Sequence, residues 1–419
     1  MSRKTRLLLV VALVAAVFRL PGLTYPKEEY FDEVYHAKTA LQYLRGEAPT
    51  EWVHPPTAKL LIAVPVALAG WARDIPVERS YRPWSWRLAP ALAGILLAPV
   101  FLLLARRVLA TERAALLATL LLLCDGVYLV QSRIAMTNVF AVLFQLLSVL
   151  LLLGAVLEQR LGLRAMSLAG IALGLALSTR WTSLWAWGFL GLVFLAVRRR
   201  RAFTPRELAL GALTFLALPA LVYLLSYVPW MRQGHSVGDV LRTQRDIWGY
   251  HANLSATHTY FSPWWTWPWL YRPTWYFWFS GEGFVRGIVA LGNPALWWAA
   301  VPVSLWALVT GIRWRDPRRV FCGAGFFLLY LPWGLAPRTL NFSHYLFEAI
   351  PYACLSLGTL LDRRWDAGQA VLARGYVVLV LALFLLFLPF LTAMPVPTAI
   401  WGFRFPTGGG LWTWFPSWI

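Results

Sequence analysis

Two adjacent carboxylates and two basic side chains lie close together near the start of the chain. Asp32 and Glu33 follow two aromatic residues, and His54 and Lys59 flank a pair of prolines. A carboxylate can accept the proton of a hydroxyl nucleophile, and a basic side chain can bind the phosphate of a leaving group. The alternative is a solvated acidic turn followed by a lysine that lays its stem along an apolar surface. The residues alone leave both interpretations open.

Four further polar residues interrupt or end long apolar stretches. Arg133 and Asn138 lie in a short connection between two such stretches, and Arg87 and Arg180 each lie at the end of one. Ionisable groups at membrane depth are costly and usually face a polar cavity that holds a partner. We therefore expect these residues to face a polar cavity, with arginines bound to lipid headgroups as the alternative.

An unusually aromatic segment, 262–278, contains Trp267 and Arg272, and a later polar segment contains Arg338, His344 and Tyr345. Dense aromatic residues are typical of the belt at a membrane interface. They also suit stacking against a sugar or flanking a lipid chain. His344 stands where an apolar stretch begins, so it is a candidate ligand or an interfacial packing residue.

The composition places these residues in a membrane protein. Of the 419 residues 59% are hydrophobic and 14% are charged, and the mean hydropathy is +0.58, which excludes a cytosolic enzyme. The net charge of +19 comes from short basic clusters between apolar runs, so it reflects topology and no nucleic-acid partner is expected. The three cysteines have neither metal nor redox spacing. No cofactor is identified, and participation of a divalent metal stays open.

The apolar runs predict an all-α polytopic protein of about eleven spans. The runs are 1–20, 87–105, 114–130, 139–157, 165–180, 182–197, 207–228, 290–310, 320–336, 345–361 and 375–394. Basic residues near span ends stay in the cytoplasm, and the clusters fall in every second loop. These clusters are Arg3 to Arg6, Arg106 to Arg113, Arg160 and Arg164, Arg198 to Arg206, Arg313 to Arg319, and Arg363 to Arg374.

This charge pattern predicts a cytoplasmic N-terminus and a C-terminus outside. The apolar segment 57–72 does not fit as a span, because every later cluster would then change sides, so we expect a re-entrant or interfacial helix. We expect a single membrane domain over 1–419, with an N-terminal catalytic half 1–228 that includes a first outer loop 21–86. A large outer loop 229–289 precedes the C-terminal helices and outer tail, 290–419.

Several of these segments resemble the protein O-mannosyltransferases, a family of the GT-C class that uses lipid-phosphate sugars. Phe31-Asp32-Glu33-Val34 resembles the family's FDEV motif, and His54 to Lys59 resembles its HPPxxK motif. Similar stretches follow in the family's order at Asp125 to Met136, Gly170 to Trp181, Trp267 to Tyr276, Gly292 to Trp298, and Arg338 to Pro351. The preference for arginine over lysine and the short length indicate a bacterial member.

The resemblance implies transfer of mannose from a polyprenyl-phosphate donor to Ser or Thr hydroxyls of exported proteins, with inversion, at the outer face of the plasma membrane. It implies Asp32 as the base, with Glu33 orienting the acceptor or pairing with a cation. Donor phosphate binding then falls to Lys59, Arg133, His54 and Arg87, and sugar or acceptor binding to Asn138, Arg180, Trp267, Arg272, Arg338, His344 and Tyr345. A secretion translocon is a conceivable partner. A transferase with a lipid or glycan acceptor, or a transporter or scramblase, are the alternatives.

Overall fold

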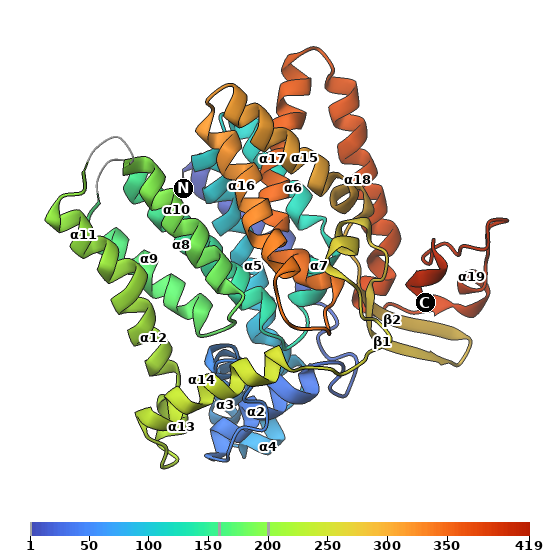
Figure 1. The fold of residues 1–419 in the computed structure, drawn as a ribbon. Helices are drawn as coiled ribbons and strands as arrows, with labels where there is room; N and C mark the ends of the chain where they lie inside the picture. Colours follow the sequence, from blue (N-terminus) through green and yellow to red (C-terminus); the bar gives the residue numbers. More distant parts are fainter. Residues whose placement is uncertain (1, 158–160, 199–201) are drawn as a thin grey trace. The chain divides into compact units, whose positions relative to one another are not determined.

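The computed structural model describes residues 2–157, 161–198 and 202–419, and it is mostly helical (Figure 1). The predicted cytoplasmic residues Arg160 and Arg199 to Arg201 lie outside the described residues. The chain divides into two compact units. The first includes the chain up to Leu20, Asp32–Arg107 and Ile134–Asn253, and the second includes Pro21–Phe31, Val108–Arg133 and Leu254–Ile419.

The first unit contains both the first outer loop and a set of long helices. Its elements are α1 (Arg3–Arg19), α2 (Glu33–Arg45), α3 (Thr57–Arg73), α4 (Val77–Ser80), α5 (Pro83–Val108), α8 (Asn138–Leu157), α9 (Leu163–Leu177), α10 (Ser183–Arg198), α11 (Pro205–Ala212), η1 (Leu213–Ala217), α12 (Leu218–Ser226), α13 (Val228–Met231) and α14 (Val237–Ala252). Helix α9 packs between α8 and α12 (Figure 1). A Cβ at Gly174 would lie 2.7 Å from that of Val222, so the close approach of α9 to α12 requires glycine there.

The second unit combines helices with a small antiparallel sheet. Its elements are α6 (Glu112–Leu123), α7 (Gly126–Gln131), η2 (Trp264–Trp269), β1 (Thr274–Gly281), β2 (Phe284–Ala290), α15 (Pro294–Arg313), α16 (Pro317–Tyr330), η3 (Leu331–Gly334), η4 (Ser343–Glu348), α17 (Ile350–Asp366), α18 (Ala370–Thr392), β3 (Val396–Pro397), α19 (Thr398–Trp401) and η5 (Pro416–Trp418). The strand order is β1-β2-β3.

The structure adds a small sheet to the expected helical architecture. Strands β1 and β2 form a hairpin whose two loop residues, Glu282 and Gly283, both have positive φ, as a tight two-residue hairpin turn demands. The predicted span 290–310 therefore begins too early, since residues up to Ala290 belong to β2 and the helix starts at Pro294.

The predicted span 114–130 is also interrupted. Helix α6 ends at Leu123, and Asp125 caps a new helix, α7, by accepting a hydrogen bond from the Tyr128 N–H at 2.9 Å. The other oxygen of Asp125 accepts the indole N–H of Trp297 at 2.7 Å. A carboxylate with these partners is satisfied inside the protein, which explains how it breaks an otherwise apolar run.

Five helical stretches among the described residues are long and apolar enough to cross a membrane. They are Pro83–Val108, Asn138–Ala155, Pro205–Ser226, Pro294–Arg313 and Ala370–Thr392. The predicted total of eleven spans stays a prediction, as does the interfacial position of the 17-residue helix α3. The multi-pass helical architecture itself is confirmed.

Candidate functional site

The two adjacent carboxylates of the first outer loop have different environments. Glu33, the first residue of α2, is fully buried and accepts hydrogen bonds from Arg87 Nε (2.9 Å), from Arg87 Nη2 (2.8 Å) and from the Ala135 N–H (3.0 Å). Asp32 is half-buried at the N-cap of the same helix, and its side chain makes no capping hydrogen bond. Glu33 thus forms a buried ion pair with Arg87, whereas the side chain of Asp32 is partly exposed.

Arg87 is a predicted donor-phosphate ligand, but in this structure two of its nitrogens bind Glu33. A guanidinium presents five N–H groups, so the ion pair uses only part of its hydrogen-bonding capacity. The role of Arg87 toward a phosphate stays a prediction. Its observed action is to fix the start of α2, and with it the position of Asp32.

Lys59 lies at the start of α3, and its ammonium is 1% exposed. It donates to the backbone oxygens of Glu51 (2.9 Å) and His54 (2.7 Å) and to the carboxylate of Glu51. Three hydrogens therefore meet three protein acceptors. To bind a phosphate oxygen, Lys59 must exchange or share one of them.

Glu51 is a residue that the sequence analysis missed. Its carboxylate accepts hydrogen bonds from Lys59, from the His54 imidazole Nδ1 (2.7 Å) and from the His54 backbone N–H (3.0 Å). Burial alone would raise the pKa of the Glu51 carboxyl, but Lys59 and His54 outweigh it and hold that pKa well below its usual range. Glu51 is therefore ionised and organises the loop that carries His54.

Two histidines beside Glu51 are held in the neutral form. Burial lowers the pKa of His54 and lowers that of His36 to about 3, although Glu51 opposes the shift in both cases. The positive charges of Arg180 and Lys59 act in the same direction as burial. With its Nδ1–H on Glu51, a neutral His54 has only an acceptor at Nε2. Its predicted binding of a donor phosphate stays a prediction, and it requires protonation.

Two more predicted residues join this part of the first unit. Arg180 donates from Nη1 to the side-chain oxygen of Asn138, and both residues are buried. The segment before Arg180 is fixed to α3 because Thr57 bonds Ser178 through its backbone N–H (3.1 Å) and its hydroxyl (2.7 Å). Residues far apart in sequence thus form one cluster with two cations and one anion, Lys59, Arg180 and Glu51.

The remaining predicted residues belong to the second unit. Arg133 is buried and donates from Nη1 to the backbone oxygen of Pro21 at 2.6 Å. Trp267 and Tyr345 contact each other edge to face at 6.0 Å, and the guanidinium of Arg338 lies 5.8 Å from the Tyr345 ring centre. Arg272 donates from Nε to the backbone oxygen of Thr259 at 2.6 Å.

His344, also in the second unit, is 1% exposed and packs among aromatic rings. It stacks on Phe342 at 5.5 Å and meets Tyr276 edge to face at 5.4 Å. This environment matches the packing role that the sequence left open. The sugar-binding role of His344 stays a prediction.

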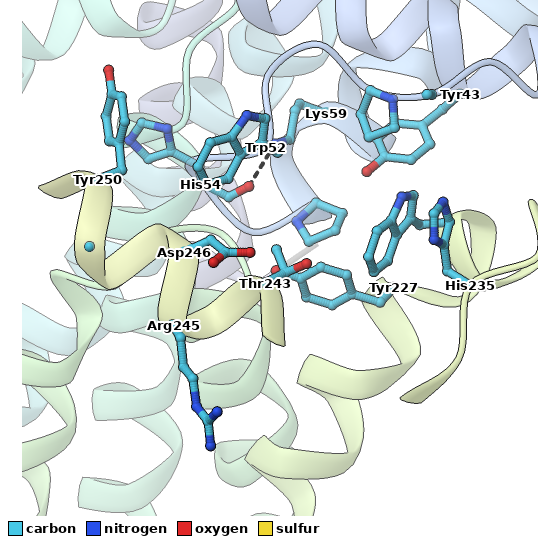
Figure 2. A pocket seen from close by; sticks show the side chains of 15 residues that line it. Tyr43, Trp52, His54, Lys59, Tyr227, His235, Thr243, Arg245, Asp246 and Tyr250 are labelled. Carbon is cyan, nitrogen blue, oxygen red and sulfur yellow. Dashed lines mark hydrogen bonds between the residues drawn. The ribbon is translucent and has the colours of Figure 1, made fainter. Parts of the chain in front are cut away.

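A cavity of about 700 Å³ opens within the first unit, between the first outer loop and helix α14 (Figure 2). His54 and Lys59 belong to its wall, together with aromatic residues from both segments. The sequence analysis assigned no role to α14. Within the described ranges, no group of three or more His, Cys, Asp or Glu residues could hold a metal ion.

Two family models match most of the chain. The model of the dolichyl-phosphate-mannose-protein mannosyltransferases matches residues 9–232, and the model of the C-terminal four TMM region of protein-O-mannosyltransferase matches residues 236–404. Two similar proteins are called polyprenol-phosphate-mannose–protein mannosyltransferase. The one from Mycolicibacterium smegmatis is 28% identical, covering 98% of this chain and 92% of that protein, and the one from Mycobacterium tuberculosis is 27% identical, covering 99% and 91%.

Solved structures share the fold. A chain of the S. cerevisiae protein O-mannosyltransferase Pmt1-Pmt2 complex bound to the sugar donor matches with a TM-score of 0.84 and 15% identity, covering 100% of this chain and 93% of that one. ArnT from Cupriavidus metallidurans bound to undecaprenyl phosphate matches with a TM-score of 0.57 and 19% identity, covering 92% and 70%. These matches confirm the predicted GT-C fold.

Proposed function

Because the chain belongs to the dolichyl-phosphate-mannose-protein mannosyltransferase family, we propose that it transfers mannose from polyprenyl-phosphate-mannose to Ser and Thr hydroxyls of exported proteins. The names of the mycobacterial relatives support both the donor and the protein acceptor. The structural observation that supports the proposal is that two neighbouring carboxylates differ in burial and in their partners. Glu33 is buried in an ion pair with Arg87, whereas the adjacent Asp32 is half-buried.

Asp32 is the base in this proposal. As the acceptor oxygen attacks the anomeric carbon, the bond to the lipid phosphate breaks and the hydroxyl proton passes to the Asp32 carboxylate. A single displacement inverts the anomeric centre and needs one base. The ion pair of Glu33 with Arg87 positions Asp32 by fixing the first turn of α2.

The leaving lipid phosphate needs positive charge and no general acid. In the first unit Arg180 and Lys59 supply it, and a neutral amide, Asn138, holds the Arg180 side chain. Lys59 is partly compensated by Glu51, so Arg180 contributes more of the net positive charge of the cluster. The family resemblance also implies that Arg133 binds the donor phosphate.

The proposed reaction takes place at the outer face of the cell membrane, with the N-terminus in the cytoplasm and the C-terminus outside. The arginine clusters between the apolar runs support this orientation. A lipid-linked donor reaches the site from the bilayer, and a polypeptide acceptor reaches it from the outer side. A secretion translocon fits as a supplier of unfolded acceptor chains.

The test is transfer by the purified protein. Radiolabelled polyprenyl-phosphate-mannose is incubated with the protein and a Ser/Thr-rich peptide, and a peptide with alanine at those positions is the matched control. We expect label in the first peptide only. Label that moves to a lipid or free glycan and never to the peptide would replace this proposal with a transferase of another acceptor class.

A further inference from the structure

The proposed reaction uses only one residue of the cavity beside α14, namely Lys59. It lies entirely within the first unit, and its walls come from the first outer loop and from the segment 227–250 (Figure 2). Its volume of about 700 Å³ lies in the range of small-molecule sites. The ligand it suits can be inferred from the groups that face it.

Aromatic rings form much of the wall. Trp52 and Tyr250 meet edge to face at 5.9 Å, and each is 41% exposed. On another side, the ring of Trp230 stacks with that of His235 at 4.0 Å. Exposed aromatic faces favour flat apolar surfaces, such as the C–H face of a pyranose ring.

The wall of the cavity contains one carboxylate, that of Asp246, among several hydrogen-bond donors. The carboxylate of Asp246 points into the cavity next to Thr243, whereas the Arg245 side chain of the same helix points away (Figure 2). No described residue forms an ion pair or hydrogen bond with the Asp246 carboxylate. An uncompensated carboxylate binds hydroxyl donors and repels anions.

Two basic residues of the wall, Lys59 and His54, are paired with Glu51. The three hydrogens of the Lys59 ammonium are directed to the Glu51 carboxylate and to two backbone oxygens. His54 is neutral, with its Nδ1–H committed to Glu51, and it too can accept a hydroxyl proton at Nε2. The carboxylate of Asp246 and the acceptor nitrogen of His54 therefore favour a hydroxyl-rich ligand in this cavity.

We propose that this cavity binds a hexopyranosyl group, with its ring against Trp52 and its hydroxyls donating to Asp246. Two substrates of the proposed function can supply such a group, namely the lipid-linked donor and an acceptor polypeptide that already carries a sugar. The proposal rests on the proposed function only for the expectation that the sugar is mannose. Recognition of the ring itself follows from the cavity.

The direct test is binding of methyl α-mannopyranoside to the purified full chain, followed by saturation-transfer NMR. We expect contact to the ring protons, and binding about tenfold or more weaker in Asp246→Asn and Trp52→Ala, as loss of a charge-assisted hydrogen bond or of a stacking face predicts. Arg245→Gln is the matched control on the same helix and should bind normally. Unchanged binding by folded Asp246→Asn and Trp52→Ala, or no binding to the wild type, overturns the proposal.

Competition identifies the source of the sugar and separates this site from an anion site. Displacement of the mannoside by polyprenyl-phosphate-mannose assigns the donor, and displacement by a mannosylated peptide but not its bare counterpart assigns the acceptor. Displacement by inorganic phosphate, together with weaker binding in Arg245→Gln, contradicts the proposal. If the wild type glycosylates peptide while the mannoside does not bind, the proposed function stands and the cavity proposal fails.

Discussion

The guanidinium of Arg87 holds the carboxylate of Glu33 in a two-pronged ion pair, with both side chains at most 1% exposed. The pair joins α5 to the first turn of α2, where Asp32 stands at the N-cap. Two carboxylates that are neighbours in sequence therefore have separate tasks. Glu33 fixes the local structure, and Asp32 is the proposed base.

Breaking this ion pair should destabilise the protein. Glu33→Gln leaves a buried guanidinium without its counter-charge, and loss of one partner of a buried pair commonly costs about 3–5 kcal/mol. Thermal unfolding in detergent should show a lower midpoint for Glu33→Gln and for Arg87→Leu, and the double variant should lose less than the sum of the two. Additive losses would mean that the two residues stabilise the protein independently.

The lysine of the first outer loop has two separable roles that a double variant can distinguish. Lys59→Met leaves Glu51 uncompensated, so the single variant should be strongly destabilised, and the added change Glu51→Gln should restore part of the stability. If Lys59 also binds the donor phosphate, the double variant should bind the donor more weakly than the wild type even though its stability is partly restored. Normal donor affinity in that variant would limit Lys59 to holding the loop.

The pH dependence of stability follows from the buried neutral histidine His36. Its pKa is lowered to about 3 by burial and by the positive charges of Lys59 and Arg180, which together outweigh the effect of Glu51. Between the ordinary histidine pKa of about 6.5 and 3, the unfolded chain binds the proton and the folded chain does not. Stability is therefore complete above about pH 6.5 and falls by up to about 1.4 kcal/mol per pH unit below it.

The variant His36→Gln removes this titrating group. Unfolding midpoints at pH 7 and pH 5 should differ less in the variant than in the wild type, because the difference between the two proteins isolates the contribution of His36. An equal loss of stability in both proteins would show that His36 does not resist protonation in the folded state.

The topology is testable by thiol labelling. The three native cysteines are buried, so we expect them to react little with the reagent, and single cysteines can be introduced at exposed alanines. Ala48→Cys in the first outer loop and Ala399→Cys in α19 should react with an impermeant reagent added outside, and Ala202→Cys should react only after permeabilisation. Labelling of Ala202→Cys in intact cells would reverse the assigned orientation.

The sequence predicted the helical membrane class and the motif-bearing loop because apolar length and charge asymmetry act locally along the chain. It did not predict the break at Asp125, whose cost is offset by Trp297, a partner distant in sequence. The hairpin had a local sequence signal, because Gly281-Glu282-Gly283 follows the aromatic run 275–279. The sequence analysis missed this signal because it assigned those aromatic residues to the belt at the membrane interface.

The candidate site shows the same division. The sequence identifies Asp32, Lys59 and His54 by their residue types and by their resemblance to motifs. It does not identify Glu51, the partner of Lys59 and His54. Glu51 lies in an ordinary polar stretch, and only the folded loop brings its carboxylate to Lys59. Likewise, the sequence analysis assigned no role to α14, and only the folded structure shows that its Asp246 faces the cavity.

The most direct test of the account is the turnover of Asp32→Asn in detergent-purified protein, measured together with donor affinity. The amide keeps the size of the side chain and cannot accept the proton, so transfer to peptide should fall about 10²–10⁴-fold while donor binding and the unfolding midpoint stay near those of the wild type. Glu47→Gln, a half-exposed carboxylate of the same loop, is the matched control and should turn over normally. Near-normal turnover by a folded Asp32→Asn would contradict the assignment of Asp32 as the base.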